Sequence, residues 1–471
     1  METITYPRRG RKLEEAITQD TLDHLMACVE LWLQGPGVVG GLQLHSCWGK
    51  TSVLGRRYQG QTVSEYYHMM SAVRQLVDRT GSARWKLFAD EVIHNILFLQ
   101  EPDGGFRHAS AEFEPTFHSG SSCPIHQNLP VLTLLDYAAW DRADPALRPL
   151  IRSTVDRHAE WFQRTFWLRG NGGHHPLPYA AGYCGVTNQD LVVVAAMTAY
   201  GRLYGDWSRY EQFGKPTLDL YLSEQYYYPR MGLFERGVGV IFAERTPYYS
   251  IILSMLGRIF KDTGDERIPP VIENVSRHLF DAVYTAPDGL LHLAWGAVTD
   301  PEDKSRVKDW RKTPVTFDGY SGILLAMQDY LQAHPDAEKQ AILDSLRSTY
   351  AAYVYSDGSI PGALWGQNPT LTITTCPPRI VDRHLAFVVE TLGDRIQEPR
   401  PVREICLLRR YGEYTWRQRG KLWSIEKNGE RVYGGYTAYA FGVTHGPEET
   451  PLFGSYDSLK EADVEEVVET F

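Results

Sequence analysis

Two kinds of helix-forming segment alternate along the chain. In the first kind, apolar residues recur three and four positions apart with charged residues between them, as in a helix that keeps one face in solvent. In the second kind, the body is apolar nearly all round, as in Leu191–Met197 and Ile323–Met327. A helix of that kind has to be covered on both sides. The alternation therefore predicts an outer and an inner layer of helices.

The alternation runs through six units and predicts twelve helices in a closed ring. Outer helices are expected at Glu14–Leu33, Arg84–Leu99, Ala146–Phe166, Trp207–Gln225, Pro269–Tyr284 and Ala337–Tyr353. Inner helices are expected at Ser64–Val77, Ile125–Ala139, Thr187–Tyr204, Thr246–Phe260, Asp318–Leu331 and Val381–Leu392. The predicted fold class is mainly α, an (α/α)6 toroid.

A glycine-bearing polar loop follows each predicted outer helix. The last five loops recur at about 55 to 70 residues, and such internal periodicity is typical of repeat architectures. The loops begin at Gly35, Asp103, Asn171, Met231, Asp288 and Asp357. They lead to the N-terminal ends of the inner helices, so loops and helix starts should converge on one rim of the ring.

The pattern changes near the C-terminus, and we expect residues 1–400 to form the toroid and 401–471 an appendage with an acidic tail. Aromatic and β-branched residues predict antiparallel strands at Tyr411–Arg417, Leu422–Glu426 and Tyr433–Val443. Asn428-Gly429 is a hairpin turn signal between the last two. The end, Glu448–Phe471, is expected to be a packed helix or a frayed tail.

Composition mainly excludes partners. The net charge of −10 offers no basic surplus for nucleic acid or an anionic membrane, and neither is expected as a partner. The six cysteines contain no CxxC pair, so we expect free thiols, no metal and no cofactor. The first residues lack the apolar run of a signal peptide, and no apolar stretch has membrane-spanning length. We therefore expect a cytoplasmic chain.

Polar and aromatic residues gather at the predicted rim, and such a ring of side chains can hold a carbohydrate. Aromatic rings stack on the CH faces of sugars, and amides or carboxylates bind hydroxyl pairs. The expected substrate-binding residues are Asn188, Gln189, Gln127, Asn128, His118, Arg236, Arg245, Tyr320, Tyr183, Trp365 and His384.

Helix capping and turn formation are the structural alternatives to these roles. Asp318 can be an N-cap, and Asp103 belongs to an Asp-Gly turn. The helix start at residues 187–190 carries more polar groups than capping needs. Thr187 can cap this helix, which leaves Asn188, Gln189 and Asp190 in its first turn and Asp190 as a candidate for substrate contact.

The twelve-helix pattern with polar inner-helix starts and a small β appendage resembles the six-hairpin glycosidase superfamily. That group includes inverting glycoside hydrolases, unsaturated glucuronyl hydrolases, toroid domains of polysaccharide lyases, and sugar 2-epimerases. The resemblance covers roughly Glu14 to Gly393 and is architectural. It implies that catalytic groups lie on the loops and inner-helix starts, but a fold does not fix the chemistry.

Inverting hydrolysis of a glycoside is the leading hypothesis. It needs two carboxyl groups about 6.5–9.5 Å apart, one acting as general acid and one as general base. The candidates are Asp190 and Asp318, with Asp103 and His126 as further catalytic candidates and Glu235 and Asp382 in reserve. Arginines are numerous at the rim, for example Arg236, Arg245 and Arg383, which favours a uronic acid or another anionic sugar.

Other functions stay open. A β-elimination lyase could use His126 with Asn128, or Tyr183 with Asn188, and a sugar epimerase could use His118 with His384. The segment Gln100–Phe106 resembles the Q-x-x-D-G-G-[FW] motif of triterpene cyclases, where that motif is repeated, whereas it occurs once here. A toroid that binds glycans without turnover is a further alternative.

Overall fold

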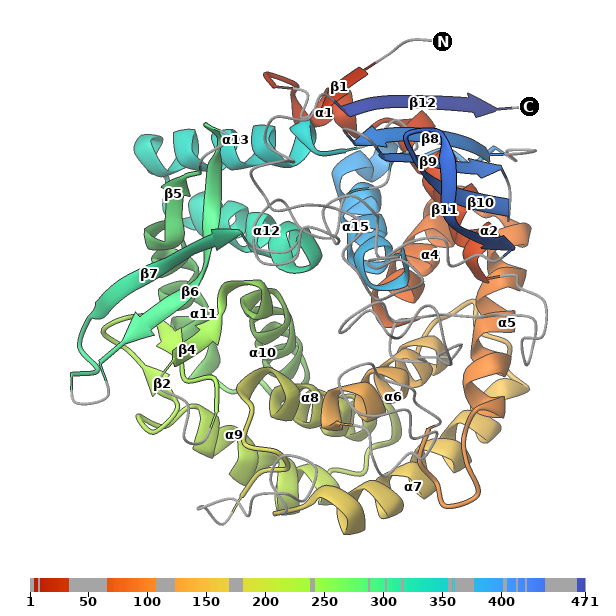
Figure 1. Ribbon diagram of the computed structural model, residues 1–471. Coiled ribbons are helices and arrows are strands. Elements are labelled where there is room, and N and C mark those ends of the chain that lie inside the picture. Colours follow the sequence, from red (N-terminus) through yellow and green to blue (C-terminus); the bar gives the residue numbers. More distant parts are fainter. Residues whose placement is uncertain are drawn as a thin grey trace.

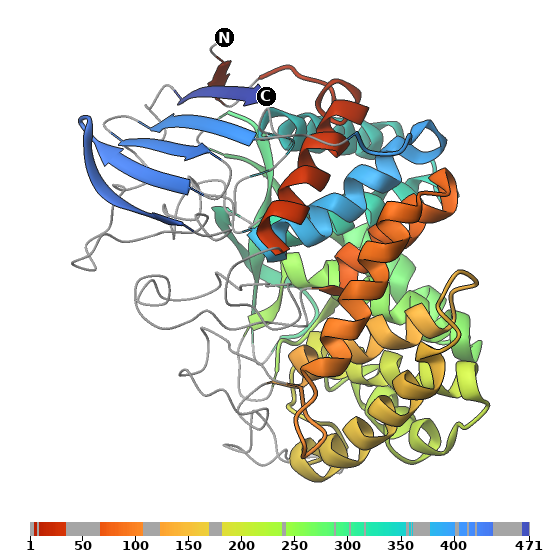
Figure 2. The ribbon, with the colours of Figure 1, turned by 90° about the vertical axis from the view of Figure 1, so that its right-hand side faces the viewer.

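The computed structural model is a ring of helices around an axis, with β-strands on one side of the ring (Figures 1 and 2). The structure describes residues 4–6, 9–33, 66–106, 123–168, 181–237, 242–286, 289–300, 303–314, 317–354, 358, 360, 377–400, 405–411, 414–419, 422–436 and 464–470. No helix within these residues has the length and the apolar character needed to cross a membrane. Cys123 and Cys184 are free thiols, as expected.

Each of the predicted helices has a counterpart. The outer layer consists of α1 (Leu13–Ala16) with α2 (Gln19–Leu33), α5 (Ala83–Phe98), α7 (Leu147–Phe166), η5 (Tyr210–Gly214) with α9 (Lys215–Tyr221), α11 (Ile268–His278) with η7 (Leu279–Ala282), and α13 (Ala337–Ala352). The inner layer consists of α4 (Tyr66–Thr80), α6 (Pro124–Ala138), α8 (Thr187–Tyr204), η6 (Thr246–Tyr248) with α10 (Tyr249–Thr263), α12 (Phe317–Ala333) and α15 (Pro377–Leu392).

The inner helices form a closed ring. In the order α4, α6, α8, α10, α12 and α15, each packs against the next, and α15 packs back against α4 (Figure 1). Figure 1 also places the outer helices around the edge of this ring. The predicted (α/α)6 toroid is therefore confirmed.

Burial follows the two sequence patterns. In inner helix α8, the run Leu191–Ala195 is buried without interruption. In outer helix α7, burial recurs every three or four residues, at Ile151, Val155, His158 and Phe162. Each buried Leu, Val or Ile side chain contributes roughly 1.5–3 kcal/mol, so the apolar bodies of the inner helices supply much of the drive to close the ring.

Two loop glycines show how neighbouring units approach each other. Gly104, after α5, has φ +107°, and a Cβ there would lie 2.6 Å from the carbonyl oxygen of Arg157 in the next outer helix, α7. Gly358, after α13, has φ +77°, and a Cβ would lie 2.6 Å from the carbonyl oxygen of Thr21 in α2. A side chain is therefore excluded at both positions, and the second contact joins the last unit to the first.

Strands from both ends of the chain form one antiparallel sheet (Figure 1). Its order is β1 (Ile4–Tyr6), β12 (Val464–Thr470), β8 (Ile405–Tyr411), β9 (Tyr414–Arg419), β10 (Leu422–Lys427) and β11 (Glu430–Tyr436). The β10–β11 turn has positive φ at Asn428 and Gly429, as a type I′ hairpin requires, so this prediction is confirmed. The expected helix or frayed tail at the C-terminus is wrong, because β12 is a strand between β1 and β8.

Further strands, which the sequence analysis did not predict, lie within the toroid repeat. β2 (Tyr227–Tyr228) pairs with β3 (Leu233–Phe234), and β6 (Leu291–Thr299) pairs with β4 (Phe242–Arg245), β5 (Val283–Thr285) and β7 (Val307–Pro314). They occupy connections between helices, and β6 contacts η6, where the α10 segment begins. Figure 2 shows β6 and β7 on the same side of the helices as the six-stranded sheet.

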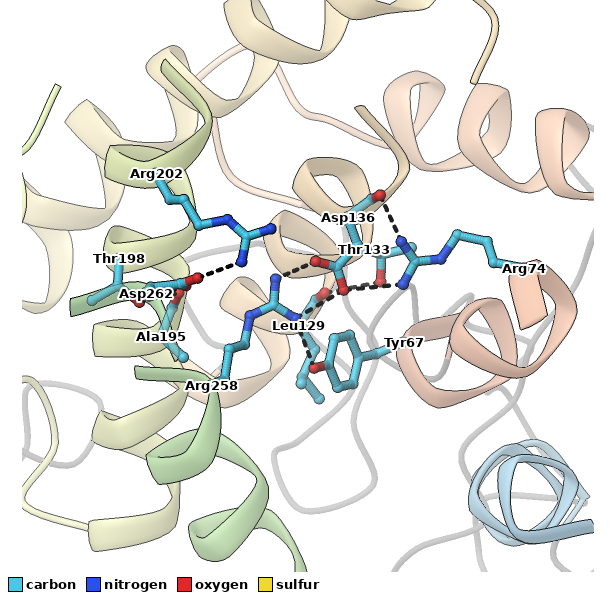
Figure 3. A network of polar contacts seen from close by, with 10 residues as sticks. All are labelled: Tyr67, Arg74, Leu129, Thr133, Asp136, Ala195, Thr198, Arg202, Arg258 and Asp262. Atoms are coloured by element: carbon cyan, nitrogen blue, oxygen red, sulfur yellow. Dashed lines mark hydrogen bonds and ion pairs between the residues drawn. The ribbon is translucent and has the colours of Figure 1, made fainter. Parts of the chain in front are cut away.

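Charged residues brace the inner ring from inside (Figure 3). Arg258 of α10 forms a bidentate pair with Asp136 of α6, with 2.8 Å between Nη1 and Oδ2, and the same Nη1 donates to the Tyr67 hydroxyl of α4 at 3.2 Å. Arg74 of α4 donates to the carbonyl oxygen of Asp136 at 2.6 Å and contacts its carboxylate at 3.3 Å. Burial by itself raises the pKa of Asp136, but Arg258 and Arg74 outweigh it and hold this pKa below its ordinary value.

We expect Arg258→Met to destabilise the fold by roughly 3 kcal/mol, because it removes the bidentate partner of a carboxylate enclosed by three helices. Urea unfolding followed by circular dichroism measures the change. The matched control is Lys215→Met, whose partner Asp219 lies four residues on in an exposed pair with 48% and 41% of the side chains accessible; its effect should stay below about 1 kcal/mol. Equal, small effects of both variants would contradict the bracing role.

Candidate active site

Polar side chains occupy the starts of the inner helices, where the loops from the outer helices arrive. Four of them, each from a different inner helix, line a cavity at the axis of the ring: His68, Ser250, Ser321 and Arg383. Polar residues therefore gather at the loop ends of the inner helices, as the sequence predicts.

A cavity of about 590 Å³ lies between α4, α10, α12 and α15. His68, Arg383, Ser250 and Ser321 line it near the starts of these helices, and Asp329 and Glu390 line it near the ends of α12 and α15. Its size suits a small ligand, since ligand pockets commonly measure several hundred Å³.

His68 and Arg383 combine a base and a cation at the loop end of this cavity. Burial, together with the charge of Arg383, lowers the pKa of His68 well below its ordinary value of 6.5. The imidazole is therefore neutral at physiological pH and can accept a proton. The guanidinium of Arg383, with the residue only 9% exposed, is a buried positive charge that can bind a carboxylate.

The opposite end of the cavity is acidic. Burial and the neighbouring charge of Glu390 raise the pKa of Asp329. Glu273 also lines this end and pairs with His334 at 3.2 Å. The cavity therefore runs from a positive loop end to a negative short-turn end, and an anionic ligand is attracted to the loop end.

A second cavity of about 750 Å³ adjoins the first at Ser254 and Gly257 and is lined by α4, α6, α8 and α10. It contains the brace of Figure 3 and, beside it, Arg202, which pairs with Asp262 at 2.9 Å. Thr198 donates to the same carboxylate at 3.2 Å. Because its charged groups are largely paired with one another, we interpret this cavity as part of the framework of the ring and place no ligand in it.

Asp190, the leading catalytic candidate from the sequence, lies fully buried in the first turn of α8. Its carboxylate accepts the backbone N–H groups of Tyr183 at 3.0 Å and Cys184 at 3.1 Å, and the Tyr221 hydroxyl at 2.8 Å. Burial raises its pKa, and these donors counteract that effect. The carboxylate therefore fixes the segment before α8, and its contact with a substrate stays a prediction.

Thr187 does not cap α8 as expected. It is the first residue of the helix, and its hydroxyl donates to the carbonyl oxygen of Glu235 at 2.6 Å. The N-cap position is held by Val186, which has no capping side chain. The carboxylate of Asp190 instead accepts the three N–H groups before the helix, at 3.0 to 3.4 Å, which accounts for the acidic residue at this helix start.

The polar residues of the α6 start also have structural partners. The Gln127 side chain forms two hydrogen bonds of 2.8 Å with the backbone of Phe106, and Asn128 donates to the carbonyl oxygen of Pro124 at 3.0 Å. Within the cyclase-like motif, Gln100 donates to the carbonyl oxygens of Gly104 at 2.9 Å and Thr154 at 2.8 Å. The motif here ties a turn to α6 and α7.

Two predicted substrate-binding arginines lie together on the β4 side of the toroid. Arg236 pairs with the buried Glu244 at 2.6 Å and stacks over the Tyr248 ring at 5.0 Å. Arg245 stacks over the Trp295 ring at 5.1 Å. Burial raises the pKa of Glu244, and Arg236 counteracts this effect. Both arginines lie next to aromatic rings, and their role in sugar binding stays a prediction.

The other predicted residues are dispersed. Tyr183 donates to Gln163 at 2.9 Å, and Tyr320 packs against Tyr350. Both ring nitrogens of His384 have hydrogen-bond partners, which are the Tyr350 hydroxyl at 2.6 Å and the carbonyl oxygen of Gly358 at 2.5 Å. His126 and Asn188 are buried, Gln189 accepts from the Cys184 thiol at 3.5 Å, and Asp103 accepts from the Gly105 N–H at 2.9 Å in an exposed turn. His118, Trp365 and the side chain of Asp318 lie outside the described residues.

No family model and no curated protein sequence matches the chain. Solved structures match it in fold. A sugar epimerase from a ruminal bacterium has 11% sequence identity and a TM-score of 0.56, with 80% of this chain and 98% of that one covered. Cellobiose 2-epimerase from Bacillus thermoamylovorans has 12% identity and a TM-score of 0.52, with 79% and 100% covered. A possible member of the GH105 family from Klebsiella pneumoniae has 12% identity and a TM-score of 0.50, with 81% and 95% covered.

The chain has the six-hairpin glycosidase-like toroid fold. The resemblance drawn from the sequence is thus confirmed at the level of the fold. At these identities the likeness carries no residue roles, so the chemistry of this toroid has to be argued from its own side chains. Among the described residues, no cluster of three or more His, Cys, Asp or Glu side chains is placed to hold a metal ion.

Sequence reasoning did not single out His68 or the brace of the toroid. Asp136 and Arg258 did leave a signal, since each is the one charged residue within the apolar run of an inner helix. A charge in such a position is costly unless it is paired. His68 left none, because its lowered pKa depends on burial and on Arg383, which is far away in the sequence.

We expect Asp190→Asn to lower the free energy of unfolding by about 2–3 kcal/mol. An amide keeps one acceptor oxygen, so N–H groups before α8 lose a charge-assisted hydrogen bond. Thermal and urea unfolding measure this. Asp206→Asn is the control, because Asp206 lies in an exposed turn where an amide can still accept from Ser208. Normal stability with loss of turnover on a sugar substrate would instead support the catalytic role of Asp190.

Proposed function

We propose that the chain is a carbohydrate-active enzyme that binds an anionic sugar at the loop end of the toroid axis. The observation that carries this proposal is that His68 and Arg383 line the same axial cavity, close enough for the charge of Arg383 to act on the imidazole. The fold supports it, since proteins with this architecture act on sugars, and so does the polarity of the cavity, which attracts an anion toward Arg383.

These two residues favour β-elimination as the chemistry. In this reaction Arg383 binds and neutralises the carboxylate of a uronic acid, which makes the proton on the adjacent carbon more acidic and stabilises the negative charge that develops. His68, neutral at physiological pH, takes the proton from that carbon. The electron pair forms a carbon–carbon double bond, the bond to the glycosidic oxygen breaks, the leaving oxygen takes a proton from solvent, and the imidazolium of His68 returns its proton to solvent. The product is an unsaturated uronate.

Inverting hydrolysis is the second candidate. Burial raises the pKa of Asp190, which is the direction that a general acid needs, although the donors around its carboxylate counteract this effect. The burial of Asp190 behind Tyr183 and Cys184 counts against direct contact, so this mechanism depends on Asp318 and Asp382 at the starts of α12 and α15. Epimerisation by His118 with His384 is less favoured, since both nitrogens of His384 are already engaged.

A screen of uronate-containing oligosaccharides separates these reactions. We expect new reducing ends together with ultraviolet absorbance from the unsaturated uronate. Reducing ends without absorbance indicate hydrolysis, and an altered sugar with neither signal indicates epimerisation. Failure of every anionic oligosaccharide, with turnover of a neutral one, would overturn the assignment of an anionic substrate.

His68→Gln should lower kcat on such a substrate by at least about a hundredfold, because the general base is lost. Arg383→Lys should chiefly raise KM, by about tenfold or more, since the bidentate contact to the carboxylate is lost. His94→Gln is the control, because this histidine is exposed and lies on the outer helix α5, outside the ring of inner helices. Unchanged kcat in His68→Gln would remove histidine from the mechanism.

The dependence of kcat/KM on pH is a further test. The folded-state pKa of His68 is lowered, so the base is deprotonated both at pH 7 and at its ordinary pKa of 6.5. We expect kcat/KM to stay level as pH falls through 6.5 and to decline only well below it. A decline centred at or above pH 6.5 that disappears in His68→Gln would show that the pKa of His68 is not lowered in the folded protein.

A further inference from the structure

A separate cavity of about 200 Å³ lies inside the wall of the toroid. It is enclosed by α6, α7 and α8 and by the π-helix η5. Most of its lining is apolar, as at Val131, Phe162, Met197 and Phe213. It opens beside Glu160, an exposed residue of α7, so a small molecule can enter from the surface without passing the toroid axis.

Three polar side chains that line this cavity carry nitrogen atoms without a hydrogen-bond partner. They are Nε2 of Gln163, Nη1 of Arg209 and a ring nitrogen of His158, whose imidazole otherwise interacts with the Gly104 backbone. His158 is 2% exposed. Such atoms are costly to bury, and native proteins rarely leave several together without an occupant.

The rest of each side chain is held in place. Arg209 pairs with Asp156 at 3.0 Å and stacks over the Tyr200 ring at 4.6 Å. Gln163 accepts from the Tyr183 hydroxyl at 2.9 Å through its oxygen. His158 packs between Phe106 and Phe162, with ring centroids 5.1 and 5.6 Å away. The unpartnered nitrogens are therefore fixed, as in a preformed site.

The backbone near the mouth is unusual as well. Arg209 directly precedes η5, a five-residue π-helix that replaces the start of the predicted outer helix, and Phe213 of η5 lines the cavity. Single-turn π-helices often occur at functional sites, because the extra residue widens the turn. A Cβ on Gly214 would lie 2.8 Å from the Tyr210 ring and 3.2 Å from the Met197 sulfur, so η5 packs closely against α8.

We propose that this wall cavity is a binding site for a small cyclic carboxylate. Donors outnumber acceptors, because Nε2 of Gln163 and Nη1 of Arg209 both carry N–H groups, whereas the N–H of the neutral His158 already faces the Gly104 backbone and leaves one acceptor nitrogen. A carboxylate satisfies that excess of donors, and an apolar ring fills the remaining space. Cavities of comparable size with apolar linings accept a benzene ring.

Burial lowers the pKa of His158 to about 3, so its imidazole stays neutral over the pH range in which a carboxylate is ionised. Arg209 can donate to the ligand through Nη1 while its Nη2 keeps the ion pair with Asp156, which also accepts from the Tyr200 hydroxyl at 2.7 Å. The site is independent of the proposed sugar chemistry, because none of its lining residues lines the axial cavities.

Calorimetric titration of the full chain with benzoate, cyclohexanecarboxylate and benzene tests the proposal. We expect both carboxylates to bind at one site, at least about tenfold more tightly than benzene, since charge-assisted hydrogen bonds add to ring burial. Ala159→Leu, at the cavity wall, should abolish binding. Ala341→Leu, the same change on the exposed face of α13, should leave it intact.

Three results would overturn the proposal. They are absence of binding at millimolar concentration, equal affinity for benzene and benzoate, and carboxylate binding that survives Ala159→Leu. A crystal soaked with benzoate that shows only water at His158, Gln163 and Arg209 would likewise assign the cavity to solvent. Arg383→Lys separates this site from the axial one, because benzoate binding in the wall should be unaffected by it.

Discussion

The bidentate pair between Arg258 and Asp136 is the interaction on which the inner ring most depends. It joins α10 to α6, which are not neighbours in the ring, and Tyr67 and Arg74 bring α4 into the same network (Figure 3). An all-apolar lining would favour collapse of the inner helices toward the axis, whereas a paired charge network keeps them apart at fixed distances. The network lines the second axial cavity, so it helps to hold α4, α6 and α10 around that space.

The outer layer closes by a different means, which is close backbone contact at loop glycines. Gly104 and Gly358 each lie where a Cβ would meet a carbonyl oxygen of the next outer helix, and the second contact brings α13 against α2. The sheet that pairs β1 with β12 adds a second link between the two ends of the chain. Closure of the ring thus depends on contacts between residues that are far apart in the sequence.

This distinction explains what could be predicted from the sequence. Helix α8 was expected with the bounds it has, because its apolar body and Gly205, which ends it with φ +73°, are local signals. Strand β12 was missed, since its partners β1 and β8 lie elsewhere in the chain. Polar excess at the α8 start was visible, but the sequence could not show that Tyr183, Cys184 and Tyr221 would surround Asp190. The His68–Arg383 pair was invisible for the same reason.

Burial then decides which polar groups remain available for chemistry. Asp190 and Gln127 lie at inner-helix starts as expected, whereas His384 lies in the middle of α15, which begins earlier than expected, and the protein itself supplies hydrogen-bond partners to all three side chains. A group with fixed internal partners stabilises the rim, whereas a group that faces a cavity can exchange its partners for a ligand. His68 is of the second kind, because it lines the axial cavity, where burial and the charge of Arg383 lower its pKa and keep it neutral. The polar start of α8 therefore stabilises the rim, whereas His68, which the sequence did not single out, faces a cavity that a ligand can enter.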